Sequence, residues 1–442
     1  AVPDARIALA LAGISVGEGA SGVPFAGTIG ITRDGEALRL ESEAVSLGDS
    51  TLSGHVAISA GDGGRRTIDA TLSADKASFA ALLAPLLGAG DTSDVLAAVA
   101  SPQHQPVSPP RSATEPTTAL PLWPEHSFDL GLLGGVDGKI ALTIGALTLE
   151  PGLTLGNARL AAELSPQSIK VASLEGDAVG GRLTSQFDLT KAPAGIGLEG
   201  KLRIDVSSKA VAPGDAQPGD TAAFDVRFSS RALSPAAIMA AMTGSGQLTV
   251  GDATLNGNSP AAVSAVARAA LTGQGPSGGT QLAEAIGAAL KQGEVKLGKI
   301  SIPVEISDGA LKLKKVQIDM TEGRSTFVTV VELATMKIDS EWQIEPKLDK
   351  GLSASPARAL LPPVTVVYTG KLSEFASLAP QVSAGALERE LVVRKLELDV
   401  GELERLRKLD ETRAREEAER RKADDERAHL DAERRKAAEE DQ

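Results

Sequence analysis

The chain of 442 residues has no cysteine, very few aromatic residues and no excess of positive charge. The absence of cysteine excludes disulfide bonds, thiolate zinc sites and a cysteine nucleophile. A net charge of −13 and an aromatic content of 2% argue against nucleic-acid binding, which relies on basic patches and on aromatic side chains that stack on bases. No run of 18 apolar residues is present, so the sequence predicts no membrane-spanning helix.

Signatures of metal binding and of nucleophilic catalysis are also missing. The HExxH, GxSxG and EF-hand patterns are absent, and the carboxylates that stand beside turn glycines are ordinary turn residues. The four histidines lie far apart in the sequence, at His55, His104, His126 and His429. We therefore expect no enzyme activity, no bound metal and no cofactor.

Two glycine clusters invite comparison with phosphate-binding loops. In "LGGVDGKI", Lys139 follows a glycine as in a Walker loop, but Leu133 replaces the first glycine and Ile140 replaces the Ser or Thr. In "GDAVGG", residues 176–181, the GxGxxG spacing is absent. Both clusters precede strand-like sequence, whereas a phosphate needs the free N–H groups of a helix N-terminus. We interpret both as turns, and we expect Arg182 to lie on a polar face.

Most of the chain alternates apolar and polar residues. Leu38 and Leu40 alternate in one short run and Val56 and Ile58 in the next, with Asp-Gly turns between runs. This pattern predicts antiparallel hairpins. The fold class that follows is mainly β: an elongated, curved antiparallel sheet, groove-like, with repeated β units, short amphipathic helices and a long charged C-terminal helix.

Composition divides the chain into five parts. We expect a β-rich unit over 1–100, strand-like from its first residues and ending in a short helix that Asp75 opens. A linker with seven prolines follows over 101–127. A second β region covers 128–350, with a helical insertion near 258–292 in which Ser259-Pro260 starts a helix. A closing segment covers 351–385, and a charged helical tail covers 386–442.

The tail allows two interpretations. Of its last 42 residues, 27 are charged: 15 acidic and 12 basic. Leu396, Val400 and Leu403 allow a short coiled-coil-like seam, but beyond Leu409 the apolar positions are nearly all alanine, which cannot drive a strong coiled coil. The tail is either a solvated spacer held by ion pairs four residues apart, or a helix that dimerises or binds an envelope protein partner.

An internal repeat relates three strand pairs. A shift of 131 residues places Leu38 on Ile169 and Leu52 on Leu183 with the strand phase preserved. A weaker third copy starts near Leu311. Repeated β units stack side by side and so extend a sheet rather than close a catalytic pocket.

The apolar face of such a sheet has two possible fates. Small helices could cover it as inert packing, or the sheet could curl and leave an open apolar trough; the residues alone leave both possibilities open. A trough suits lipid acyl chains, because burial scales with apolar area and demands little side-chain specificity. The candidate lining of this lipid groove is Ile140, Leu142, Ile144, Leu183, Phe187, Leu198, Leu202 and Ile204.

Several stretches carry a family resemblance. They are "GKIALTIGALTLEPGLTLGNARLAAEL", "GSGQLTVGDATLNGNSPAAVSAVARA" and "ISDGALKLKKVQIDM". Over residues 128–345 the chain resembles the AsmA-like C-terminal region of the AsmA family of Gram-negative bacteria. The segment "LPPVTVVYTGKLSEFASLAP" and the helical tail resemble the end of alphaproteobacterial members.

This resemblance implies a location and a role. Family members project into the periplasm from one N-terminal helix in the inner membrane, and they are linked to outer-membrane biogenesis and to phospholipid carried along a β groove. The chain starts at Ala1 and shows no anchor, so we expect a fragment of a longer protein. The alternative is a structural or assembly factor that helps outer-membrane proteins mature without carrying lipid.

Overall fold

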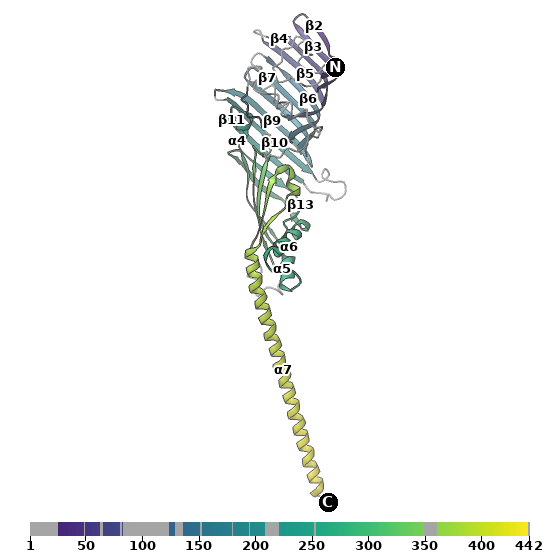
Figure 1. The fold of residues 1–442 in the computed structure, drawn as a ribbon, viewed down its shortest axis with the longest axis vertical. Coiled ribbons are helices and arrows are strands. Elements are labelled where there is room, and N and C mark those ends of the chain that lie inside the picture. The colour runs from purple at the N-terminus through teal and green to yellow at the C-terminus, as the bar shows by residue number, and fades with distance from the viewer. Residues whose placement is uncertain are drawn as a thin grey trace, which may run out of the picture.

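A computed structural model describes residues 25–47, 49–61, 65–79, 82, 123–128, 136–150, 153–178, 180–193, 195–207, 221–251, 253–348 and 360–440. Its main element is an 18-stranded sheet, and the long helix α7 (Gly385–Glu440) projects from one end of it (Figure 1). This architecture confirms the fold class predicted from the sequence. The strands expected before residue 25 and most of the proline-rich linker lie outside the described residues.

The strands follow one another along the sheet almost in chain order. They are β1 (Phe25–Gly27), β2 (Gly30–Asp34), β3 (Ala37–Leu47), β4 (Ser50–Ala60), β5 (Arg66–Ser78), β6 (Val136–Glu150), β7 (Leu153–Ser165), β8 (Ser168–Ala178), β9 (Gly181–Ala192), β10 (Gly195–Ser207), β11 (Thr221–Ala232), β12 (Thr243–Val250), β15 (Ile300–Ser307), β16 (Ala310–Met320), β17 (Gly323–Glu332), β18 (Lys337–Pro346), β19 (Val364–Lys371) and β20 (Gln381–Ser383). Both β1 and β2 pair with β3, and β12 pairs with β15.

One pair of strands in the described sheet is parallel. Strands β5 and β6 pair in parallel from Arg66 opposite Val136 to Ser78 opposite Thr148, whereas all other described pairs are antiparallel. The two β regions on either side of the proline-rich segment therefore share one sheet. The helix expected to open at Asp75 was placed too early, because Asp75 lies within β5 and accepts a hydrogen bond of 2.7 Å from the Thr51 N–H.

The predicted repeat is present as a four-stranded antiparallel unit that occurs three times: β2–β5, β7–β10 and β15–β18. The central hairpins have the same form, with Leu47 opposite Ser50, Ala178 opposite Gly181 and Met320 opposite Gly323. Each hairpin carries one extra residue in its first strand, between Ser42 and Val45, between Val171 and Leu174, and between Leu313 and Val316. A bulge increases the local twist of a strand, so the repeated bulges favour the curl of the sheet.

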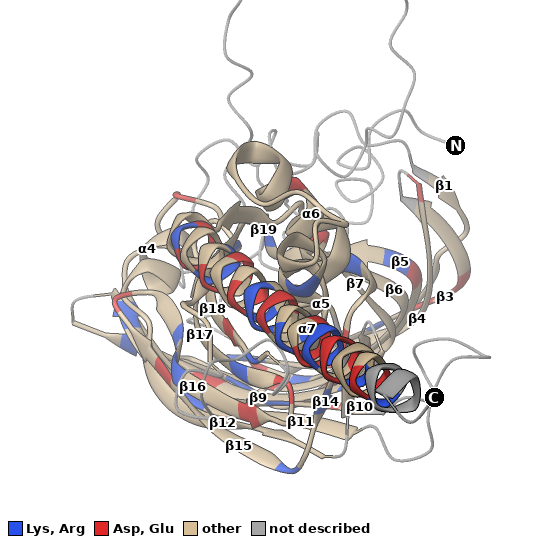
Figure 2. Ribbon diagram, turned by 90° about the horizontal axis from the view of Figure 1, so that it is seen from below, with Lys and Arg blue, Asp and Glu red and all other residues tan. Residues whose placement is uncertain are grey.

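The excursion between β12 and β15 forms a separate helical lobe. It contains β13 (Ala253–Asn256), α5 (Pro260–Leu271), α6 (Gly279–Gln292) and β14 (Glu294–Leu297). Strands β13 and β14 pair with each other where the chain enters and leaves the lobe. Pro260 occupies the first turn of α5, as the sequence predicted, and α6 ends at Gly293. The core of the lobe includes Ile302 of the flanking strand β15. The lobe packs against β17, β18, β20 and the start of α7, on the inner side of the curled sheet (Figure 2).

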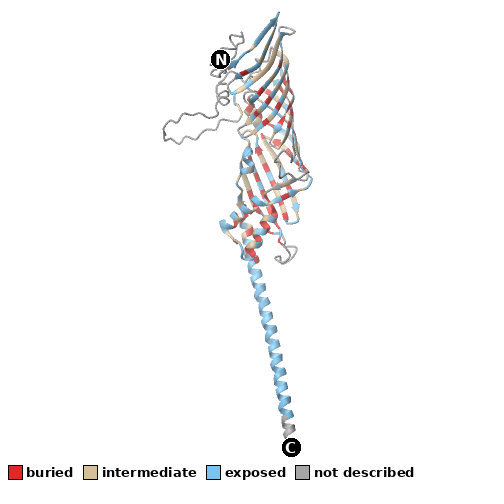
Figure 3. Cartoon of the chain, turned by 90° about the vertical axis from the view of Figure 1, so that its right-hand side faces the viewer, coloured by how far each residue is buried: buried red, intermediate tan, exposed pale blue. Residues whose placement is uncertain are grey.

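Burial follows this arrangement. Buried residues are concentrated along the sheet and under the lobe, while α7 is exposed along its projecting length (Figure 3). Leu387 and Leu391 in the first turns of α7 are almost fully buried in the same core cluster as α5 and α6. The helix is therefore fixed to the body at its base and exposed to solvent further along.

Candidate functional site: an apolar trough

One face of the sheet is mainly apolar from β5 to β16. A single row of paired residues runs across it from β5 to β19, perpendicular to the strands. This central row is Leu72, Leu142, Leu160, Leu174, Ser185, Leu202, Val226, Gly246, Val304, Leu313, Thr329, Ser340 and Tyr368. Successive side chains of a strand alternate between faces, so every second residue on either side of the row shares its face, except across a bulge, where the alternation shifts by one residue. We call this inner, concave face the trough.

The outer face carries the charge. Arg203 donates hydrogen bonds of 2.7 and 2.8 Å to Asp205, and these hold the pKa of the Asp205 carboxyl below its usual range. Arg324 bonds Asp319 in the same way and lowers its pKa. Arg182 pairs with Glu175, which confirms its predicted place on the polar face. These exposed ion pairs make the outer face hydrophilic, and they contribute little to the free energy of unfolding.

In its middle section the trough contains a cavity of about 330 Å³, at the lower end of the ~300–1,000 Å³ typical of small-molecule sites. Its lining contains no titratable side chain. The lining residues are Phe79, Trp123, Phe128, Leu149, Leu153, Leu174, Leu183, Ser185, Phe187, Leu189, Leu198, Leu202, Phe224, Val226, Phe228, Pro235, Ile238, Met239, Met242, Ile306, Leu311, Leu333 and Met336. The hydroxyl of Ser185 donates a 3.0 Å hydrogen bond to the Lys201 carbonyl and so adds no free polar group.

The cavity gathers the rare side chains of this chain. Six of its eleven aromatic residues and three of its four methionines line the cavity. Aromatic rings supply large apolar area, and methionine is flexible enough to fit ligands of varied shape. Such a concentration in an aromatic-poor protein distinguishes this section of the sheet from uniform core packing.

A short segment and a short helix cover the cavity from the inner side. Helix α4 (Pro235–Ala240) starts at Ser234, whose side chain accepts a hydrogen bond from the Ala237 N–H, and it buries Ile238. Residues 123–128 lie beside it: Trp123 donates a 2.9 Å hydrogen bond from Nε1 to the Leu333 carbonyl. The ring of Trp123 meets that of Phe79 edge to face, with centroids 6.0 Å apart. The last part of the proline-rich segment therefore packs on the sheet.

Glycine makes room for the aromatic side chains. Gly200 lies in β10 between two phenylalanines, opposite Phe187 on β9 and Phe228 on β11. A Cβ atom at this position would lie 2.6 Å from the Phe187 Cβ and 2.8 Å from the Phe228 ring. Any larger residue would displace one of the two rings, so glycine is required by this close approach.

The eight residues predicted to line a groove all lie on the trough face. Leu183, Phe187, Leu198 and Leu202 line the cavity directly. Ile144 is buried in the same core cluster, with Leu142 and Ile204 packed against it. Ile140 is half-buried on the same face, opposite Ala70 and Ala162. Strand alternation thus placed these residues on one face, while whether that face binds lipid stays a prediction.

Sequence reasoning missed the cover of the cavity. Trp123, Phe128 and the α4 residues come from segments without strand alternation, so periodicity gave no reason to place them over the sheet. A usable signal was present: aromatic residues cluster at the end of the proline-rich segment in a chain that has few of them.

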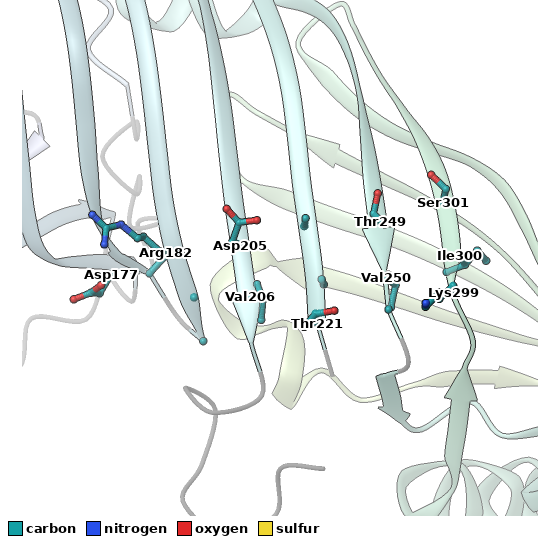
Figure 4. Close-up of a pocket in the computed structure, with 16 residues that line it drawn as sticks. Asp177, Arg182, Asp205, Val206, Thr221, Thr249, Val250, Lys299, Ile300 and Ser301 are labelled. Atoms are coloured by element: carbon teal, nitrogen blue, oxygen red, sulfur yellow. The ribbon is translucent and has the colours of Figure 1, made fainter. Parts of the chain in front are cut away.

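A second, larger hollow of about 950 Å³ lies at the ends of β8–β12 and β15 (Figure 4). Two of its charged groups have partners on the outer face: Arg182 pairs with Glu175, and Asp205 with Arg203. Asp177 accepts a 2.8 Å hydrogen bond from Asn157. The remaining charged group of its lining is Lys299. Because most of the charged groups around the hollow are already paired, we take the apolar cavity as the candidate site.

The cluster at 176–181 contains the predicted turn, but the turn predicted at Gly138-Lys139 is wrong, because both residues lie within a strand. Gly180 has a positive φ of 74° in the two-residue turn between β8 and β9, and Lys139 lies within β6. Among the described residues, no group of three or more His, Asp or Glu side chains could hold a metal ion. None of the described helices is long and apolar enough to cross a membrane.

Comparisons with known proteins add no family. No protein-family description, no curated protein and no solved structure matches the chain. The resemblance to the AsmA family therefore stays a prediction from the sequence.

Proposed function

We propose that this protein binds lipid by inserting an acyl chain into the trough, without catalysis. The observation that supports this most directly is the lining of the cavity, in which 22 of 23 residues lack a hydroxyl or charge and the hydroxyl of the remaining one, Ser185, is bonded to the backbone. A site of this kind offers no recognition to a polar ligand. It accepts an unbranched hydrocarbon chain along its length.

The energetics fit such a ligand. Burial of methylene groups from water contributes about 0.8 kcal/mol each, so ten methylenes in the trough contribute ~8 kcal/mol, which corresponds to micromolar affinity. Transfer from a bilayer instead of water gains far less, because the chain is already in an apolar medium. The trough would then exchange lipid with a membrane near equilibrium rather than hold it irreversibly.

Together with the AsmA resemblance, this leads us to propose a periplasmic protein of envelope or outer-membrane biogenesis that binds or conducts phospholipid. The full-length protein would be anchored in the inner membrane.

Two tryptophans make the proposal testable. Trp123 lines the cavity, whereas Trp342 lies under the helical lobe, where its ring stacks on Phe327 at 4.3 Å. In the Trp342→Phe variant, lysophosphatidylcholine with a dibrominated acyl chain should quench the fluorescence of Trp123, because bromine quenches by contact. The unbrominated lipid should not. Absence of quenching at saturating lipid would rule out acyl binding at this cavity.

A matched pair of substitutions separates the trough from the outer face. Leu202→Asp places a charge in the central row and should weaken quenching at least tenfold, because a charge among apolar groups opposes chain burial. Gln186→Asp adds the same charge on the exposed outer face, opposite Lys201. It should leave lipid binding unchanged. Equal binding by both variants would contradict the trough as the site.

The exposed side of α7 supports a second candidate. Leu396 and Leu403 are 61% and 66% exposed and share one face of the helix with Val392 and Val400. An apolar stripe without a described partner suits an assembly factor that contacts an envelope protein through this helix. Deletion of α7 beyond Arg394 would favour this candidate if function were lost while lipid binding persisted.

A further inference from the structure

The trough changes character toward its C-terminal end. From β5 to β16 the central row is apolar, apart from Ser185, but its last three members carry hydroxyl groups: Thr329, Ser340 and Tyr368. Thr329 and Ser340 share a hydrogen bond of 2.8 Å, and Trp342 donates from Nε1 to the Ser340 hydroxyl at 3.1 Å. A buried network of this kind is costly to open, because each separated group would lose its partner.

The helical lobe covers this same end. Val263 and Ala267 of α5, and Leu282 and Ile286 of α6, are fully buried in a cluster with Trp342 and the sheet residues around it. This cluster meets the cavity cluster on β15, where Ile302 belongs to the lobe side and Ile306 to the cavity side. The cavity and the core of the lobe are therefore neighbours along β15.

Polar contacts hold the lobe in place. Tyr368 donates a 2.8 Å hydrogen bond to Oδ1 of Asn258 at the start of α5. The N–H of Gly279 at the start of α6 donates to Oε1 of Glu388 in α7 at 2.9 Å. The lobe is thus tied to the sheet and to the helix that leaves it.

We infer that the trough is closed at its C-terminal end by this lobe, and that an acyl chain enters the cavity from the β2–β5 side. On that side the central row begins at Leu72, and the apolar face continues onto β3 and β4 through Leu40 and Val56, which are paired with each other. The inference rests on the proposed lipid binding and adds the direction of entry. The acyl chain enters from the β2–β5 side, stops at the closed end of the trough and does not continue beneath the lobe.

The first test again uses the two tryptophans. Trp123→Phe leaves Trp342 as the only tryptophan, under the lobe. Brominated lysophosphatidylcholine should quench Trp342 at least fivefold less than it quenches Trp123 in the Trp342→Phe variant. Equal quenching would mean that the chain reaches beneath the lobe and would overturn the inference. Failure to quench Trp123 would contradict lipid binding itself, so the two ideas fail separately.

The second test locks the lobe. A Cβ atom at Gly287 in α6 would lie 3.6 Å from Cγ2 of Val382 in β20, so side chains at these two positions are in direct contact. The chain has no other cysteine, so Gly287→Cys with Val382→Cys forms one defined cross-link. Oxidation should change the rate of Trp123 quenching less than twofold. A tenfold slower rate would mean that the lobe must open for loading, contrary to the inference.

The third test addresses the proposed route. Leu72→Asp places a charge in the central row on the β2–β5 side, and Ser73→Asp places the same charge on the exposed outer face of the same strand. Leu72→Asp should slow loading at least tenfold, and Ser73→Asp should leave it within twofold. Unchanged loading in both variants would place the route elsewhere, such as across the open strand ends of Figure 4, and would overturn the inference.

Discussion

Tyr368 offers the sharpest test of how the helical lobe is held on the sheet. It is the only tyrosine of the chain, and its hydroxyl satisfies the side-chain oxygen of Asn258. Asn258 is buried and adopts a left-handed backbone conformation with φ of 55°. Tyr368→Phe keeps the ring but removes the donor. Since a buried acceptor then loses its partner, we expect the free energy of unfolding to fall by about 1–3 kcal/mol.

Tyr368 should also make the stability of the protein decrease at alkaline pH. Burial raises the pKa of the Tyr368 hydroxyl above its usual value of about 10. Between that value and the raised pKa, the unfolded chain loses the proton while the folded chain keeps it, so the free energy of unfolding decreases as pH rises. This loss should be absent in Tyr368→Phe.

Both expectations can be measured without interference from other residues. Denaturant unfolding at neutral pH gives the cost of the lost hydrogen bond, and ultraviolet absorbance follows phenolate formation by the single tyrosine. Thr369→Val, which removes an exposed hydroxyl from the outer face of β19, serves as the control and should change the free energy of unfolding by less than about 0.5 kcal/mol. The reasoning is refuted if Tyr368→Phe costs no more than this control, or if the tyrosine titrates at pH 10 or below.

Two further substitutions test the packing. Ile286→Ala removes a fully buried side chain from α6 and should lower the free energy of unfolding by about 2–5 kcal/mol. The control Gln281→Ala, at an exposed position of the same helix, should change it by less than about 0.5 kcal/mol. Equal effects of the two variants in denaturant unfolding would mean that the lobe has no packed core. Gly246→Val should lower the melting temperature markedly, because a Cβ atom there would lie 2.1 Å from a carbonyl oxygen of the adjacent strand. In the control Gly298→Ala, the added Cβ atom has no neighbour within 4 Å, so this variant should have the melting temperature of the parent protein.

Much of the sheet could be predicted because its signals are local. Alternation fixed the face of each strand, so Leu183 and Leu202 were placed together although they lie on different strands. Turn length preserved the phase of the repeat: each central hairpin closes with two residues between its strands, which keeps the copies in register. These features depend on neighbours within a few residues, and a sequence displays them directly.

The remaining features depend on contacts between distant segments. The parallel pairing of Arg66 with Val136 and the packing of Trp123 beside Phe79 join parts of the chain that share no periodic pattern. The docking of the lobe was equally hidden, because α5 and α6 are amphipathic helices that could have covered any apolar strands. The trough was one of two open possibilities for the same reason: only the three-dimensional arrangement determines which strands receive a helical cover.

The parallel joint between β5 and β6 has a consequence for how the chain folds. Every antiparallel hairpin forms from residues close in sequence, so each four-stranded unit can grow strand by strand with little loss of chain entropy. Strand β6 instead meets β5 only after the whole segment between Ser78 and Val136 has been looped back. We expect this closure to be the slow step of folding. Until it occurs, the facing edges of β5 and β6 are unpaired, and the same edges of two chains could pair with each other.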